Sequence, residues 1–296
     1  MNYLKHHNSV SVIILTWNQL GFLKKCLHSV LSQTHKPDQI IVVDNASTDG
    51  TKYYLMSSDL DLTLIGNESN LGFPKAMNRG LERVNGDYCL LLASDIVIAH
   101  DVIKIFLDFI KDKDNVGFLG GYVYNYLNQR LIFTGKKIAL RWTLEQKNLP
   151  HEGIIGETDL NAGAFFFAKT KLLKEFKGFD ERIFFYFEDL DLCLRVKKAG
   201  FNNFILPQAK AYHLEGDSGI KKHENNEKSQ FELLKNIMVI YFKHASLFWL
   251  GVFYIRYMLF GLIKNIFIKK MRAVTIKTRF WVLYNTVGLI KSRYTN

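Results

Sequence analysis

Three short polar segments in the first half of the chain each follow an apolar run and could together hold a ligand. They are Thr16-Trp17-Asn18, Asp44-Asn45 and Asp95. Carboxylate, amide and hydroxyl oxygens of this kind can accept hydrogen bonds from a ribose hydroxyl or from the NH of a base. Each segment has a plainer alternative, because Asp44–Gly50 could be a solvated turn and Asp95 a helix cap. No Gly-x-Gly-x-x-Gly follows the first apolar run, which argues against a dinucleotide-dependent dehydrogenase.

The elements that must position these segments alternate between strand and helix patterns. Apolar runs of strand length predict strands over Val10–Trp17, Gln39–Val43, Leu62–Gly66 and Tyr88–Ala93. We expect Asn18 to cap a helix that buries Leu23, Cys26, Leu27, Val30 and Leu31, and a second helix to cover Gly72–Val84. Such alternation is typical of an α/β protein with a mostly parallel sheet, whose ligands bind at the carboxyl ends of the strands.

The second half of the chain has a different pattern. Residues 116–170 are aromatic and β-rich, and they are followed by a predicted helix, Leu190–Ala199, and a predicted strand, Phe201–Leu206. On that helix Asp191 lies four residues before Arg195, so we expect a structural ion pair.

Several motifs, read in order, resemble glycosyltransferase family 2, and most closely its bacterial rhamnosyltransferase-like branch. The resemblance covers roughly residues 9–218 and rests on Thr16-Trp17-Asn18, Val42–Thr51, Asn70–Phe73 with Asn78, Asn161–Ala164, Gly178–Glu181, Glu188–Arg195, and His213 with Gly216 and Ser218. It implies a GT-A fold, with a Rossmann-like nucleotide-sugar-binding half over 9–115 and an acceptor and catalytic-base half over 116–230. It also implies an inverting transfer of rhamnose or another hexose from a UDP- or dTDP-sugar to a lipid-linked or growing cell-surface glycan.

The resemblance also assigns roles to individual residues. The general base comes from Glu188-Asp189, with Asp189 as the first choice and Glu188 as the alternative. Asp95 and His213 are expected to hold a divalent cation, manganese or magnesium, on the diphosphate. The expected contacts to the nucleotide-sugar donor are Thr16, Asn18, Asp44, Asn45, Asn70, Gly72, Asn78, Ser94, Asp95 and Gly163.

The chemistry of sugar transfer accounts for these residue types. A carboxylate within ~3 Å of an acceptor hydroxyl can take its proton, and burial among Phe184–Phe187 would raise the pKa of that carboxyl. A cation can neutralise the charge that develops on the diphosphate leaving group. The chain departs from the family at Ala93-Ser94-Asp95, where the family often has two acids. A weakly bound cation and independence of metal are therefore both open.

The net charge of +11 is concentrated at the C-terminal end. Residues 231–296 hold eleven Lys and Arg but one acid, Glu232, whereas residues 1–230 are nearly neutral. Basic residues interleaved with aromatic and aliphatic ones predict an amphipathic helical extension that associates with an anionic membrane surface. We expect no nucleic-acid partner, because the aliphatic content exceeds what a phosphate-binding surface needs.

The longest apolar stretch of this extension is Ala245–Ile263, which has Arg256 near its middle. We favour helices that lie in the membrane interface over a single spanning helix, because a central arginine opposes insertion. A helical cover on the catalytic domain, or on a second subunit of a homo-oligomer, is the alternative.

Cys26, Cys89 and Cys193 fall within apolar patterns, and the first residues lack a secretory signal, so we expect an enzyme at the cytosolic membrane face. The rival interpretations are a nucleotidyltransferase and a non-enzymatic basic binding protein.

Overall fold

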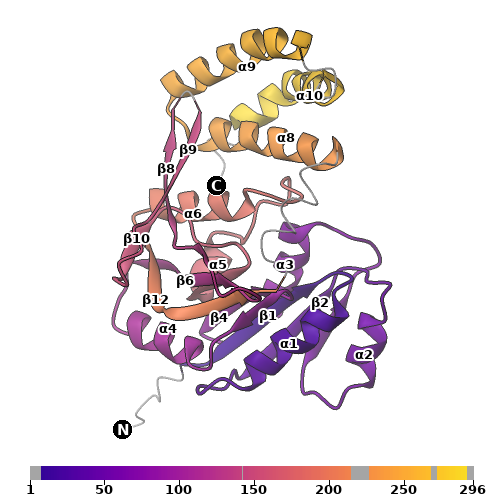
Figure 1. Cartoon of the computed structure of the whole chain (residues 1–296), viewed down its shortest axis with the longest axis vertical. Helices are drawn as coiled ribbons and strands as arrows, with labels where there is room; N and C mark the ends of the chain where they lie inside the picture. Colours follow the sequence, from indigo (N-terminus) through magenta and orange to yellow (C-terminus); the bar gives the residue numbers. More distant parts are fainter. Residues whose placement is uncertain (1–7, 142, 215–226, 268–271, 292–296) are drawn as a thin grey trace.

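The structure is a computed structural model that describes residues 8–141, 143–214, 227–267 and 272–291 (Figure 1). Its centre is a ten-stranded sheet in which helices cover both faces, and three C-terminal helices stack above one end of it. Of the sequence motifs above, Gly216 and Ser218 lie outside the described residues.

The first half of the chain forms the parallel part of the sheet, with the strand order β3-β2-β1-β4. These strands are β1 (Val10–Thr16), β2 (Gln39–Asp44), β3 (Thr63–Gly66) and β4 (Tyr88–Ala93). The connecting helices are α1 (Leu20–Leu31), α2 (Thr51–Ser57) and α3 (Phe73–Leu81). All four strands were predicted from their apolar runs. Strands β1, β2 and β4 are buried along nearly their whole length, as expected of strands covered on both faces, whereas β3 is a partly exposed edge strand.

The second half extends the same sheet in the order β4-β11-β6-β12-β10. Strands β6 and β12 are parallel to each other, and the antiparallel β11 between β4 and β6 gives them the direction of β4. The predicted mostly parallel sheet is therefore confirmed. The elements of this half are β5 (Ile96–Ile98), α4 (Val102–Ile110), β6 (Val116–Asn125), β7 (Leu131–Phe133), β10 (Gly156–Thr158), β11 (Phe165–Lys169), α5 (Thr170–Glu175), α6 (Glu188–Lys198) and β12 (Asn202–His213).

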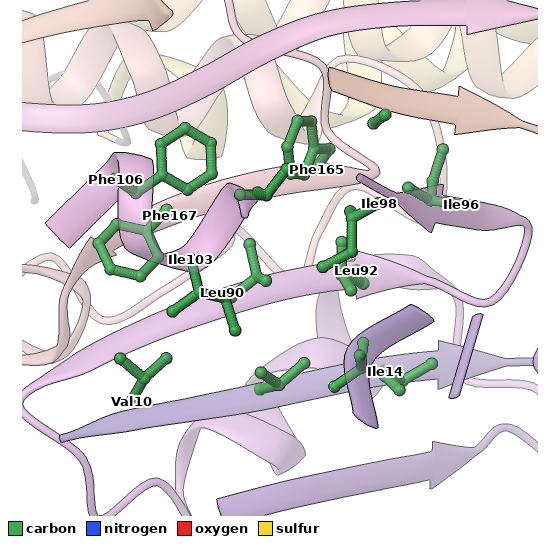
Figure 2. Close-up of a cluster of buried hydrophobic side chains, with 14 of the residues drawn as sticks. Val10, Ile14, Leu90, Leu92, Ile96, Ile98, Ile103, Phe106, Phe165 and Phe167 are labelled. Carbon is green, nitrogen blue, oxygen red and sulfur yellow. The ribbon is translucent and has the colours of Figure 1, made fainter. Parts of the chain in front are cut away.

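Two hydrophobic clusters lie on opposite faces of this sheet. Alternate residues of β1 divide between them, so that Val10, Val12 and Ile14 face one cluster and Ile13 and Leu15 the other. Figure 2 shows the first cluster, in which rings from α4 and β11 pack over the apolar side chains of β4 and β5. These rings are Phe106, Phe165 and Phe167, with Phe106 to Phe167 centroids 5.2 Å apart.

The C-terminal segment forms α8 (Glu227–His244), α9 (Leu247–Phe267) and α10 (Arg272–Lys291). A third hydrophobic cluster joins these helices to one another and to Ile183 of the catalytic half. Ile240 of α8 packs instead into the core of the sheet, together with the hairpin of β8 (Lys136–Leu140) and β9 (Leu144–Asn148). The helical prediction for this segment is confirmed, and α8 packs on the second half of the sheet domain. Within the described residues, no helix is both long and apolar enough to cross a bilayer.

Three local predictions differ from the structure. Helix α1 begins at Leu20 with Gln19 before it, because Asn18 adopts a positive φ of 53° and its side chain binds the β2 turn. Leu31 is exposed at the end of that helix. The predicted strand 201–206 continues to His213, since the residues beyond Leu206 pair with β6 and β5.

Candidate active site

Polar side chains line the carboxyl edge of the parallel strands, where ligands of open α/β sheets bind. Thr16 and Asp44 are register partners at the ends of β1 and β2. Ser94 lies on the other side of Thr16, because its backbone N–H donates to the carbonyl of Leu15 at 2.9 Å. The hydroxyl of Thr16 is buried and has no hydrogen-bond partner within the described residues. A buried hydroxyl that lacks a partner is costly, so this edge is suited to a polar ligand.

Two asparagines at this edge hold its loops together. Asn45 donates from Nδ2 to Asn70 Oδ1 at 3.0 Å, and its Oδ1 accepts from Asn67 Nδ2 at 2.9 Å and from the N–H of Leu71 at 3.0 Å. Asn70 Oδ1 also accepts the N–H of Gly72 at 2.9 Å. Direct donor contacts by Asn45 and Asn70 stay a prediction, and the structure gives both amides a role in shaping the loop.

The turns after β1 and β2 are linked in the same way. Asn18 accepts the N–H of Thr48 at 2.6 Å and donates its own N–H to Ser47 Oγ at 2.9 Å. The N–H of Ser47 in turn donates to Asp44 Oδ1 at 3.1 Å. Asp44 is buried at the centre of this network, and its second carboxylate oxygen fits the predicted contact to a ribose or base.

The loop that follows β3 contacts the loop that precedes Glu188-Asp189. Gly72 has a φ of +82°, and a Cβ there would lie 2.5 Å from the carbonyl oxygen of Phe184, so only glycine fits. The next residue, Phe73, donates its N–H to that carbonyl at 3.0 Å. Asn78 binds both the N–H and the carbonyl of Phe179 at 2.9 Å. Gly72 and Asn78, predicted to contact the donor, thus contact residues 179–184, the loop before the acid pair.

Asp95 and His213, the two predicted metal ligands, are brought together by the antiparallel pairing of β5 with β12. Asp95 Oδ2 lies 3.3 Å from His213 Nε2. Asp95 Oδ1 is buried and has no partner within the described residues. Among the described residues no group of three or more His, Cys, Asp or Glu could hold a metal ion, and Asp95 and His213 are a pair of candidate ligands. A carboxylate and an imidazole, completed by phosphate and water oxygens, fit a six-coordinate cation such as manganese.

The acid pair begins helix α6. Glu188 is almost fully buried and its Oε2 has no partner within the described residues. Burial, and then the charge of Asp189, raise the pKa of Glu188 to about 8. Burial also raises the pKa of Asp189, but the N–H groups of Leu190 and Gly163 and the charge of Lys136 oppose the rise. The two neighbouring carboxyls titrate together, and the backbone N–H donors of Asp189 favour its ionised form.

Gly163 connects the acid pair to the strand-end edge. Its N–H donates to Asp189 Oδ2 at 3.1 Å, and a Cβ at this position would lie 2.9 Å from that oxygen. The next residue, Ala164, accepts the N–H of Ala93 at 3.0 Å, two residues before Asp95. The predicted base and the predicted metal-binding acid are thus held by neighbouring residues of one loop.

Asp191 forms the structural ion pair predicted for it, with Arg195 Nε 2.9 Å from Asp191 Oδ2. Its other oxygen lies 2.5 Å from Lys243 Nζ and 2.8 Å from His244 Nε2, both on α8. Burial alone would raise the pKa of Asp191, but the His244 hydrogen bond and the charges of Arg195 and Lys243 lower it well below its usual range. The α8 partners had no signal in the sequence, because they are distant basic residues within a generally basic segment.

An open depression of about 570 Å³ lies at the other end of the sheet, away from all of these groups. It is lined by Gly86, Asp87, Thr170, Lys171, Lys174 and Glu175. Because it opens where β4 begins and β11 ends, it does not belong to the ligand-binding edge.

The fold and these groups define an enzyme class. A polar strand edge, a neighbouring Asp–His pair and a buried carboxylate pair suit an enzyme that transfers a group from a nucleotide donor. The model of the family described as "Glycosyl transferase family 2" matches residues 11–174. The chain therefore belongs to glycosyl transferase family 2, and the nucleotidyltransferase and non-enzymatic interpretations are set aside.

Curated relatives cover different shares of the chain. It is 26% identical over 232 residues to N-acetylglucosaminyl-diphospho-decaprenol L-rhamnosyltransferase of Mycobacterium tuberculosis, covering 68% of this chain and 75% of that protein. It is 26% identical to the glycosyltransferase GlyG of Streptococcus pneumoniae over 173 residues, which are 56% of each chain.

Solved structures confirm the fold. Residues 1–349 of S. aureus TarS in complex with UDP-GlcNAc superpose with a TM-score of 0.60 at 19% identity, covering 91% of this chain and 79% of that one. GalNAc-T7 with UDP, GalNAc and Mn²⁺ gives 0.61 at 15% identity, covering 70% and 43%. The predicted GT-A fold is confirmed for this chain.

Proposed function

We propose that the protein transfers a hexose from a UDP- or dTDP-sugar to an acceptor hydroxyl with inversion, in one displacement, and that Asp189 is the general base. The observation that carries this proposal is the loop at Gly163–Ala164, which binds Asp189 on one side and the end of β4 on the other. A sugar whose diphosphate lies at the strand edge would present its anomeric carbon near Asp189. The acceptor oxygen forms a bond to that carbon as the bond to the diphosphate breaks, and the hydroxyl proton passes to Asp189.

Their different surroundings would give the two carboxyls different roles in the reaction. Asp189 accepts two backbone N–H bonds, which favour its ionised form, and it is the more exposed of the two. Glu188, with its pKa near 8, would remain protonated at neutral pH and donate a hydrogen bond. Two adjacent carboxyls that differ in this way provide one base and one neutral donor.

Asp95 and His213 would hold the divalent cation, manganese or magnesium. When bound, the cation supplies positive charge for the diphosphate leaving group. The orphaned Asp95 Oδ1 supports this role, and so does the Mn²⁺ with which GalNAc-T7 was crystallised.

The relatives favour a role in cell-surface glycan synthesis. The mycobacterial relative is a rhamnosyltransferase whose acceptor, by its name, is a lipid-linked sugar. Another relative, AmsB of Erwinia amylovora, is an amylovoran biosynthesis glycosyltransferase that is 28% identical over 216 residues. We therefore place rhamnose or another hexose as the donor sugar and a lipid-linked or growing glycan as the acceptor.

We further propose that α10 docks on the cytosolic face of an anionic membrane. Five apolar side chains recur along its exposed side at helical spacing: Phe280, Leu283, Tyr284, Val287 and Ile290. Leu247 and Phe248 are exposed at the start of α9. Exposed apolar rows beside basic residues are typical of helices that lie in a membrane interface.

The Asp189→Asn variant tests the proposed function. Transfer of sugar is expected to fall by about 10² to 10⁴, because general-base assistance is lost, while the Kd for the nucleotide stays within a few-fold of wild type. A panel of nucleotide diphosphates in a thermal-shift assay identifies the base, and the matching nucleotide sugars then serve as donors. Near-normal transfer by Asp189→Asn together with an inactive Glu188→Gln would move the base to Glu188.

A further inference from the structure

Helix α8 lies against the catalytic half, between α6 and the outer helices α9 and α10 (Figure 1). Three of its polar side chains, Asn236, Lys243 and His244, are nearly or fully buried and point at the segment that carries the acid pair. Buried polar groups far from the ligand edge need a reason to be kept, because burying them without function is unfavourable.

Asn236 binds the two residues that precede Phe187, the N-cap of α6. Its Nδ2 donates to the carbonyls of Phe185 and Tyr186, at 2.7 and 3.1 Å. Tyr186 and Phe187 both adopt left-handed backbone conformations, with φ of 71° and 68°. Residues other than glycine adopt this backbone conformation only where their surroundings hold them in it. Asn236 thus binds and stabilises the strained turn that directly precedes Glu188.

Lys243 and His244 hold the two ends of the same segment. Lys243 Nζ lies 2.8 Å from Asp180 Oδ2 and 2.5 Å from Asp191 Oδ1, and His244 Nε2 lies 2.8 Å from the same Asp191 oxygen. Asp180 precedes the aromatic loop and Asp191 follows the acid pair. Burial alone would raise the pKa of Asp180, but its bonds to Arg182 and Lys243 lower it to about 2, so both anions are kept charged at neutral pH.

We propose that α8 is a positioning element of the active site, and that Asn236 is its central residue. Its contacts fix residues 180–191 at three points around Glu188-Asp189, and Ile183 is anchored in the hydrophobic cluster of the C-terminal helices. The inference rests on the proposed function only in that the acid pair carries the base. Correct placement of a base matters greatly, since a displacement of about 1 Å can cost on the order of 10²-fold in rate.

The test replaces Asn236 by leucine, which is similar in size and removes the donor together with an Oδ1 that is buried and has no partner among the described residues. The matched control is Ile110→Ala on α4, which loses apolar packing in the cluster on the opposite face of the sheet, a cluster that contains no residue of 180–191. We measure kcat and KM with the nucleotide sugar that the panel identifies, the Kd for the nucleotide diphosphate, and backbone hydrogen exchange at residues 184–190.

Asn236→Leu is expected to lower kcat by about ten- to a hundred-fold, to leave the nucleotide Kd within two-fold, and to speed exchange at residues 184–190. Ile110→Ala should lower the melting temperature and keep kcat within two-fold at a temperature where it is folded. A conservative Asn236→Gln variant, which retains an amide donor, should recover part of the lost rate. If Asn236→Leu keeps wild-type kcat while Asp189→Asn is inactive, the positioning role is wrong and the proposed function stands. If Asp189→Asn and Glu188→Gln are both fully active, the proposed function itself fails.

Discussion

The buried acid pair makes the stability of the protein depend on pH in a direction that can be worked out. Glu188 is 6% exposed, and its pKa rises from 4.5 to about 8. Between these two pH values the folded protein holds a proton that the unfolded chain has released. The free energy of unfolding therefore falls as pH rises, by up to about 1.4 kcal/mol for each pH unit.

Replacing Glu188 by glutamine removes this ionisation while keeping the shape of the side chain. From pH 5 to pH 7.5 the wild-type protein should lose roughly 3 kcal/mol that the Glu188→Gln variant keeps. Because the two carboxyls titrate together, the difference between the two proteins reports the loss of Glu188 together with its effect on Asp189. The variant is thus expected to gain in relative stability as the solution becomes more basic.

The assay is urea denaturation at pH 5, 6.25 and 7.5, with the exposed loop variant Glu152→Gln as the matched control. The control should run parallel to wild type at every pH. Parallel curves for Glu188→Gln and wild type would refute the reasoning, because they would mean that Glu188 ionises at the same pH in the folded and unfolded chains.

Two further outcomes are expected. Asp95→Ala should weaken binding of a nucleotide diphosphate when manganese is present and have little effect without it, whereas the exposed loop control Asp61→Ala should have little effect in either condition. The measurement is calorimetric titration. Equal affinities of the wild-type protein with and without manganese would contradict a metal role for Asp95 and His213. The double variant Phe280→Ser and Tyr284→Ser should lose at least ten-fold in binding to vesicles containing anionic lipid, because each exposed side chain contributes roughly 1.5–3 kcal/mol when buried. Unchanged vesicle binding by the double variant in sedimentation would contradict membrane docking through this face. If the wild-type protein forms dimers that the double variant does not form, this face is a subunit interface instead.

Strands β1, β2 and β4 were predictable because a strand covered on both faces is apolar at most positions, and the sequence shows this directly. The Asp191–Arg195 pair was predictable for a similar reason, since residues four apart on a helix face each other. The meeting of Asp95 with His213 followed from motif order, and the structure supplies its cause in the pairing of β5 with β12.

What sequence could not predict depends on contacts between distant segments. Asn45, Asn70 and Asn78 have the residue types of ligand-binding groups, yet their amides hold loops together in the structure. An amide binds a backbone carbonyl and a ribose hydroxyl equally well, so composition alone cannot separate the two roles. The sequence also contains no indication of Lys136, whose charge lowers the pKa of Asp189. Nothing in the sequence distinguishes this lysine from the others, and only the β8–β9 hairpin brings it close to Asp189.

The C-terminal basic charge illustrates the same point with a consequence for membrane binding. Lys243 is paired with Asp180 and Asp191, Lys235 is paired with Glu232, and Arg279 donates to the carbonyl of Tyr257. These cations serve the interior of the protein, so the charge that faces a bilayer is smaller than the sequence suggests. Electrostatic attraction is largely screened beyond about 8 Å at physiological ionic strength. The free energy gained by burying apolar surface does not depend on this screening. Salt should therefore weaken vesicle binding without abolishing it, and the apolar row of α10 should carry the remainder.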